Sequence, residues 1–184
     1  MQKTDLSKFD NSWYNPGNLF KRGLWFFVNG CVMQNRMNPF SRIRVFFLKI
    51  FGAKVGVGVI IKPNVNIKYP WNLEIGNNVW VGEQVWIDNL GKVKIGDNVC
   101  LSQGSMLLCG NHNYKKVEFD LVVGDIILEE GVWIGAHSVV CPGVRCKSHS
   151  ILSVNSVAVQ TLERYTIYQG NPAIELRNRE FKHE

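Results

Sequence analysis

The chain has 184 residues and a formal net charge of +6. This length suits one domain with an appended segment. The basic balance suggests an anionic ligand or surface, but no RNA-binding motif or long basic run points to nucleic acid. The five cysteines contain no CxxC pair, which favours free thiols in a reducing, cytoplasmic compartment over disulfides or zinc. No signal peptide is evident, and no apolar run reaches the ~20 residues that span a bilayer.

Residues 1–52 are expected to form a polar segment followed by a helical cap. Two Phe-rich stretches that also carry basic residues, 18–34 and 41–51, have glycines near their ends, Gly30 and Gly52, as helices often do. Such helices would cover the open end of a solenoid, whose terminal turn otherwise exposes unpaired strand edges. Peripheral contact with a membrane, as basic amphipathic helices, is the alternative, and the two roles are compatible.

A six-residue repeat organises residues 53–160. Neither the helical period of 3.6 nor the strand period of 2 explains it, whereas a parallel β-helix with three hexads per triangular turn does. A second inward position, four residues later in each hexad that has no extra residues, holds only Val and Ser. The first inward position is aliphatic in every hexad but one, where it is cysteine: Val55, Ile61, Ile67, Ile75, Val81, Ile87, Ile95, Leu101, Leu107, Leu128, Ile134, Val140, Cys146 and Leu152.

The third hexad of each early turn is lengthened. As a result, all the extra residues fall on one side of the prism, and the segments 69–71, 88–90 and the long excursion 107–127 are expected to stack along one edge. This count brings His112 near Asp88 and Asn89. Long loops on rigid scaffolds often carry function, so we interpret 107–127 as an active-site loop.

Residues 161–184 follow the solenoid. We expect a returning strand at 164–168 and a turn at Gly170, Asn171 and Pro172. A short helix is expected over 173–181.

Several segments together resemble a known family. They are FGAKVGVGVIIKP from Phe51, YPWNLEIGNNVWVG from Tyr69, DNLGKVKIGDNVCLSQ from Asp88, GNHNY from Gly110 and GNPA from Gly170. They resemble the hexapeptide-repeat acyltransferases, and most closely the colanic-acid-biosynthesis acetyltransferases of the galactoside, maltose and serine acetyltransferase group. The family loop usually reads SHDY, and here Asn113 replaces its aspartate.

The resemblance implies a left-handed parallel β-helix and a homotrimer with active sites between subunits. It also implies acetyl-coenzyme A as the donor and no metal. The expected reaction is O-acetylation of a sugar or a sugar-linked, even lipid-linked, intermediate in exopolysaccharide synthesis.

Transfer of an acetyl group from a thioester to a hydroxyl needs a base, and histidine, with an ordinary pKa of about 6.5, suits this role. His112 is the predicted base. The substrate-binding candidates are Trp86, Asp88, Asn89, Asn113 and Tyr114, although bend chemistry explains Asp88 and Asn89 equally well. Trp71 and Trp86 would stack on a sugar, or pack in the trimer.

The coenzyme-binding candidates are of two kinds: a turn that resembles the family's coenzyme-binding turn, and cations that could pair with the phosphates. They are Trp133, Gly135, Ala136, His137, Lys147, Gly170, Asn171, Pro172 and Arg177, with Arg164 and Arg179 as further cations.

Two alternatives remain open. A γ-class carbonic anhydrase-like enzyme would share the fold but needs three imidazoles around one zinc, and only His112 lies in the loop. A non-catalytic scaffold would keep the fold without the chemistry, and Asn113 is the feature in its favour.

Overall fold

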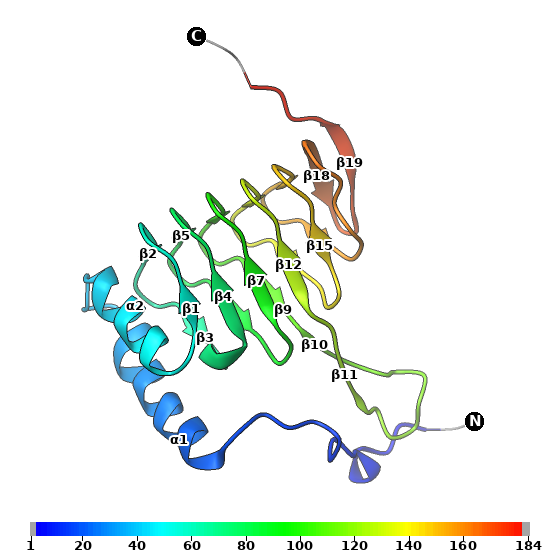
Figure 1. The fold of residues 1–184 in the computed structure, drawn as a ribbon. Helices are drawn as coiled ribbons and strands as arrows, with labels where there is room; N and C mark the ends of the chain where they lie inside the picture. Colours follow the sequence, from blue (N-terminus) through cyan, green and yellow to red (C-terminus); the bar gives the residue numbers. More distant parts are fainter. Residues whose placement is uncertain (1–2, 182–184) are drawn as a thin grey trace.

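The computed structural model describes residues 3–181, so residues 1–2 and 182–184, at the ends of the first and last predicted segments, lie outside the described part. The chain winds into a three-sided column (Figure 1). Sheet 1 contains β1 (Lys54–Val55), β4 (Leu73–Ile75), β7 (Val93–Ile95), β12 (Ile126–Leu128) and β15 (Arg145–Cys146). Sheet 2 contains β2 (Ile60–Ile61), β5 (Trp80–Val81), β8 (Cys100–Leu101), β13 (Trp133–Ile134), β16 (Ile151–Leu152), β18 (Thr166–Gly170) and β19 (Ala173–Asn178). Sheet 3 contains β3 (Asn66–Ile67), β6 (Trp86–Asp88), β9 (Met106–Leu108), β14 (Val139–Val140) and β17 (Val157–Ala158).

The hexad positions fill the inside of the column. Every first inward position from Ile61 to Leu152 is at most 4% exposed, and only Val55, in the first turn, is half-buried. Strands pair in parallel with Val55 opposite Ile75, Ile75 opposite Ile95, and Ile95 opposite Leu128. The predicted parallel β-helix is therefore confirmed, with the excursion inserted between two stacked turns.

The bends between sheets form three edges, which we name after the histidine on each. The His149 edge joins sheets 1 and 2, the His137 edge joins sheets 2 and 3, and the His112 edge joins sheets 3 and 1. Asn78 and Asn98 adopt φ of 54° and 57° on the His149 edge, the left-handed conformation that asparagine tolerates better than most residues. On the His137 edge, a Cβ on Gly135 would lie 2.6 Å from the nitrogen of Val154, so only glycine fits this approach of two turns.

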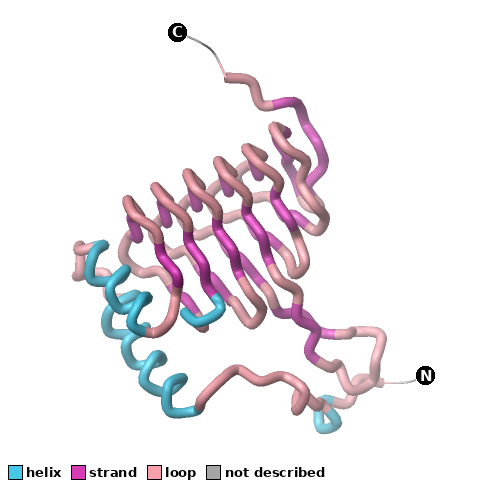
Figure 2. The backbone as a smooth tube through the Cα atoms, viewed as in Figure 1, coloured by secondary structure: helices cyan, strands magenta, loops and turns pink. Residues whose placement is uncertain are grey.

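Two helices, α1 (Leu19–Val28) and α2 (Ser41–Ile50), cover the first turn (Figures 1 and 2). A π-helical turn at Asn29–Met33 follows α1. Trp25 is 2% exposed, and its indole nitrogen donates to the carbonyl of Ile67 at 2.8 Å. Leu48 is fully buried in the same core. These contacts close the end of the column, which confirms the predicted cap.

The predicted helix over 173–181 is wrong. The segment forms β19, which pairs antiparallel with β18, and β18 in turn pairs parallel with β16. The predicted turn at Gly170, Asn171 and Pro172 connects the two strands, and the returning strand begins at Thr166. As a strand, the segment satisfies the backbone groups on the outer side of β18, and β19 itself becomes the edge of sheet 2.

The cysteines differ sharply in accessibility. Cys109 and Cys146 are fully buried, and burial raises the pKa of each thiol to about 12, whereas Cys31 is exposed. Since the thiolate is the reactive form, we expect Ellman's reagent at pH 8 to modify Cys31 rapidly and to reach Cys109 and Cys146 only in denaturant. A Cys31→Ser variant serves as the control. Equal rates at all five thiols of the native protein would contradict this core.

Candidate active site

The lengthened bends stack along the His112 edge as predicted. The side chain of Asn89 bridges to the turn below, accepting from the backbone nitrogen of Tyr69 at 2.9 Å and donating to its carbonyl. Asn72 donates to the carbonyl of Leu90 at 3.2 Å. On the next turn, a Cβ on Gly110 would lie 2.5 Å from the side chain of Leu90, which shows how closely the excursion follows this stack.

The excursion is a hairpin. Strands β10 (Gly110–His112) and β11 (Leu121–Val123) pair antiparallel, and beyond them Asn113 donates to the carbonyl of Asp120 at 2.8 Å. The hairpin projects away from the column, as Figure 1 shows. His112 therefore sits at the end of a strand, where backbone pairing fixes its position.

The imidazole of His112 is held in one orientation. Its Nδ1 lies 2.9 Å from the carbonyl oxygen of Phe119, and the two rings stack at 4.4 Å with an interplanar angle of 6°. Phe119 has φ of 55°, which is uncommon for a bulky side chain. In this conformation its carbonyl oxygen points at the imidazole of His112. A carbonyl only accepts, so in neutral His112 Nδ1 carries the proton and Nε2 remains an acceptor.

A cavity of about 580 Å³ lies against His112. Asp88 also lines it, and Lys68 pairs with that carboxylate at 2.8 Å. A second cavity of about 440 Å³ runs on to α1 and shares with the first Arg22, Lys68, Tyr69 and Asp88. We call the two together the ridge groove. The ridge groove is lined by two basic residues, Arg22 and Lys68, by the carboxylate of Asp88 and by the imidazole of His112.

The N-terminal segment, predicted only to be polar, contributes residues to the site. Phe9, Asn11, Tyr14 and Pro16 line the cavity opposite His112. The hydroxyl of Tyr14 donates to the carbonyl of Leu90 at 2.8 Å, and burial raises its pKa, so it remains a donor at neutral pH. Asp5 donates its backbone N–H to the carbonyl of Val117 at 2.9 Å, which ties the segment to the hairpin. The aromatic residues and the proline turn were the only signals of this in the sequence.

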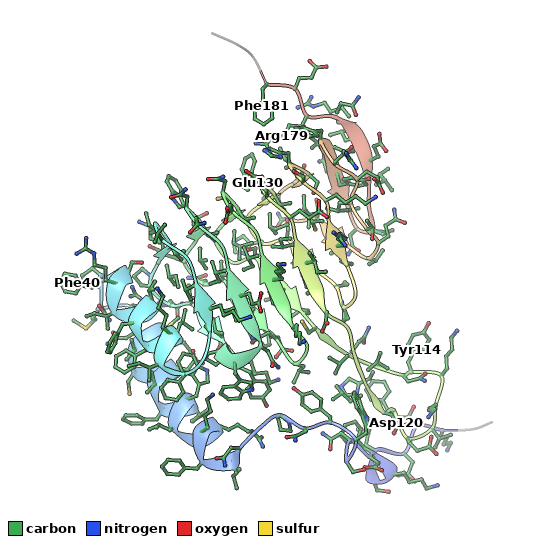
Figure 3. All side chains as sticks on the ribbon, in the orientation of Figure 1. Phe40, Tyr114, Asp120, Glu130, Arg179 and Phe181 are labelled. Carbon is green, nitrogen blue, oxygen red and sulfur yellow. The ribbon has the colours of Figure 1, made fainter. Side chains whose placement is uncertain are left out.

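The predicted substrate-binding residues divide into two groups. Asp88 lines both cavities, and Trp86, 37% exposed, lines the one beside α1. Asn89 is fully buried, and its amide is occupied by Tyr69, so it holds the bends together as the alternative interpretation expected. Asn113 accepts from the backbone nitrogen of Lys115 at 3.2 Å, and Tyr114, 76% exposed, sits at the hairpin tip (Figure 3). Neither residue lines the groove.

Trp71 stacks against Tyr69 at 5.1 Å and lies under the ammonium group of Lys21 at 4.8 Å. Protein groups therefore already contact this ring, whereas Trp86 has an exposed surface. Of the two tryptophans proposed to stack on a sugar, the geometry favours Trp86.

The predicted coenzyme-binding residues lie on two edges. Gly135, Ala136 and His137 form a bend of the His137 edge, where Asn155 donates to the carbonyl of Ala136 at 2.9 Å. Gly170 reaches the same edge by donating to the hydroxyl of Ser156 at 3.0 Å, and Asn171 and Pro172 follow it. Trp133 projects from sheet 2 beside this edge and donates to Ser102 at 2.8 Å.

The cationic candidates lie elsewhere. Lys147 is on the His149 edge, paired with Glu163 at 2.7 Å. Arg177 is at the opposite end of the β18–β19 hairpin from Gly170, next to Ile167, and Arg179 donates to the carbonyl of His149 at 3.2 Å. Arg164 lies just before β18, at that same end. The cations and the glycine-rich bend are thus separated by the width of sheet 2.

The histidines of the column do not converge. His112, His137 and His149 occupy three different edges, and within residues 3–181 no three His, Cys, Asp or Glu side chains gather as a metal site would require. His183 lies outside that range. The zinc-dependent alternative therefore has no ligand set among the described residues.

Comparison with known proteins places this arrangement in a class. No family model matches the chain. "Putative colanic acid biosynthesis acetyltransferase WcaF" of Escherichia coli (strain K12) is 34% identical over 176 residues, which cover 95% of this chain and 97% of the relative. Galactoside O-acetyltransferase of the same organism is 27% identical over 73% of this chain and 68% of its own length. The crystal structure of a hexapeptide-repeat acetyltransferase from Vibrio cholerae shares the fold, with a TM-score of 0.79, 20% identity, and coverage of 88% of this chain and 92% of that one.

The column of hexapeptide turns and these relatives together identify the class as the hexapeptide-repeat acetyltransferases. Within this class, the chain belongs to the family of acetyltransferases that contains WcaF. The prediction of an enzyme that uses acetyl-coenzyme A as its acetyl donor is thereby confirmed.

Proposed function

We propose that the protein O-acetylates a sugar or sugar-linked acceptor in surface-polysaccharide synthesis, with His112 as the general base. The observation that supports this most is the contact of Nδ1 with the Phe119 carbonyl at 2.9 Å, which leaves Nε2 as the acceptor. The names of WcaF and of galactoside O-acetyltransferase support a sugar as the acceptor. Acetyl-coenzyme A bound to the Vibrio cholerae structure, at a TM-score of 0.76 and 20% identity, agrees with the donor.

In the proposed step, Nε2 takes the proton of the acceptor hydroxyl while its oxygen attacks the thioester carbonyl carbon. The C–O bond forms and the C–S bond breaks. Coenzyme A leaves as a thiolate and takes up the proton that the imidazolium then releases. No covalent enzyme intermediate is required, because holding both substrates in contact supplies much of the acceleration.

The residue that differs from the family loop, Asn113, is adjacent to His112. In the family pattern the residue after the histidine is an aspartate, and here it is Asn113. The carbonyl of Phe119 already orients the imidazole, so the proposed mechanism does not need a carboxylate at this position.

The proposed donor site is completed by a neighbouring subunit of a homotrimer. His112 and the bend of Ala136 and His137 lie on different edges of one column, with sheet 3 between them. Outward-facing residues of sheet 2 stack in register as Ile60, Trp80, Cys100 and Trp133, and Trp80 is 60% exposed. An apolar stripe of this kind fits a subunit interface, and packing there would bring the His137 edge of one copy towards the His112 edge of the next.

The function is tested by measuring coenzyme A release from acetyl-coenzyme A with a panel of nucleotide sugars and lipid-linked sugars. We expect at least one acceptor to raise release well above hydrolysis, and its product to gain one acetyl group by mass spectrometry. Binding of acetyl-coenzyme A without transfer to any acceptor would favour the non-catalytic scaffold.

A further inference from the structure

The outer side of the helical cap exposes large apolar side chains. On α1 they are Phe20, Leu24 and Phe27, spaced by four and three residues and 80%, 48% and 67% exposed. On α2, Ile43 and Phe46 form a matching stripe, together with Ile50, which is 59% exposed. We define these six residues as the cap face.

The cap face turns away from the column. The residues of the same helices that close the column, Trp25 and Leu48, lie on their opposite sides. Between the helices, Met37 and Phe40 are 91% and 64% exposed, and Phe40 points outward at this end of the molecule (Figure 3). Apolar surface is thus continued from one helix to the next through their connection.

Positive charge surrounds this apolar surface. Residues 11–73 contain nine Lys and Arg and no Asp or Glu, so the rest of the chain, with twelve basic and fifteen acidic residues, has a net charge of −3. Arg36, Arg42 and Lys49 are exposed on the cap, and no salt bridge in the described part of the chain involves them. The surplus charge of the protein is therefore concentrated at its capped end.

From this combination we infer that the cap face docks on an anionic lipid surface. Helices that present Phe, Leu and Ile between Lys and Arg bury their apolar side in the headgroup region and place their cations near lipid phosphates. A second copy of the same face would bring like charges together, which opposes a face-to-face dimer. The contact is peripheral: no helix among residues 3–181 has the length and apolarity to cross a bilayer, and α1 and α2 have ten residues each.

Docking in this way sets the orientation of the enzyme. The cavity of the ridge groove beside α1 is lined by Leu19 and by Phe26, which is 81% exposed at the same end of the molecule. The α1 end of the groove would then lie next to the lipid surface. This surface assignment does not rest on the proposed function, since it requires neither His112 nor an acceptor.

The test is sedimentation of the full chain with vesicles of phosphatidylcholine, with and without phosphatidylglycerol. We expect binding only to vesicles that contain phosphatidylglycerol, weakened by salt. The triple variant Arg36→Glu, Arg42→Glu, Lys49→Glu should bind at least about a hundredfold more weakly, given roughly a fivefold effect per cation. The variant Phe20→Ser, Phe27→Ser, Phe46→Ser should lose binding as well.

The matched control is Ile174→Ser with Leu176→Ser, which removes two exposed apolar residues of β19, at the other end of the column. This variant should bind like wild type, and all variants should keep the wild-type circular dichroism spectrum. Wild-type protein that stays in the supernatant, or binding that none of the cap substitutions changes, overturns the inference. So does a change of oligomeric state on cap substitution without any vesicle binding, since the cap face would then be covered by another copy.

Discussion

Replacing His112 with alanine is expected to lower acceptor-dependent release of coenzyme A by about a hundred- to ten-thousandfold, the usual contribution of a positioned general base. Nε2 is the atom that accepts the hydroxyl proton, because Nδ1 is engaged with the carbonyl of Phe119. The substitution removes the acceptor of the hydroxyl proton and leaves the paired strands β10 and β11 in place. The measurement is the steady-state rate with a thiol reagent, at saturating acetyl-coenzyme A.

The control is His149→Asn, which removes an imidazole from a different edge and keeps a residue that tolerates the left-handed conformation at that position, where φ is 60°. This variant should retain its rate, and both variants should keep the wild-type oligomeric state. Near-normal turnover of His112→Ala would mean that another group is the base.

Replacing Ile95 with alanine is expected to destabilise the column by about 2–5 kcal/mol. Ile95 is 2% exposed in β7, with turns stacked on both sides, so the truncated side chain leaves a cavity that two neighbouring turns hold open. The measurement is the midpoint of urea unfolding at a fixed protein concentration, since dissociation of subunits contributes to the transition.

The adjacent residue provides the control. Lys94 points outward from the same strand, between the buried Val93 and Ile95. Lys94→Ala should therefore change the stability by no more than about 0.5 kcal/mol. Similar losses for both variants would show that β7 is not packed with alternate side chains inside and outside.

Most of the fold could be predicted because a six-residue period leaves few alternatives. The buried set from Ile61 to Leu152 follows directly from the spacing, and the lengthened hexads place Asp88 and the hairpin of His112 on one edge. The segment 173–181 was mistaken for a helix because its pairing partner, β18, is an element that no local pattern in 173–181 identifies.

The site was predictable only in part. Spacing placed His112 and Asp88 together, but the orienting carbonyl of Phe119 and the hydroxyl of Tyr14 come from hydrogen bonds that the sequence does not encode locally. Spacing also places Asn89 near His112 and cannot distinguish substrate binding from bend chemistry, whereas the hydrogen bonds to Tyr69 show that the amide holds the bends together. The predicted coenzyme-binding residues lie on two different edges of the column. The sequence shows the charge of Lys147 but not its pairing with Glu163, so it cannot distinguish this lysine from a cation free to bind phosphate.

The central claim, that His112 on the ridge of one subunit meets a thioester held by the next, is tested most directly by a crystal structure of the protein with coenzyme A. We expect a trimer in which the thiol end of the coenzyme lies in the ridge groove beside Nε2 of His112, while the His137 edge of the adjacent copy holds the pantetheine chain. A coenzyme bound within one subunit, with its sulfur remote from the His112 edge, would contradict the account.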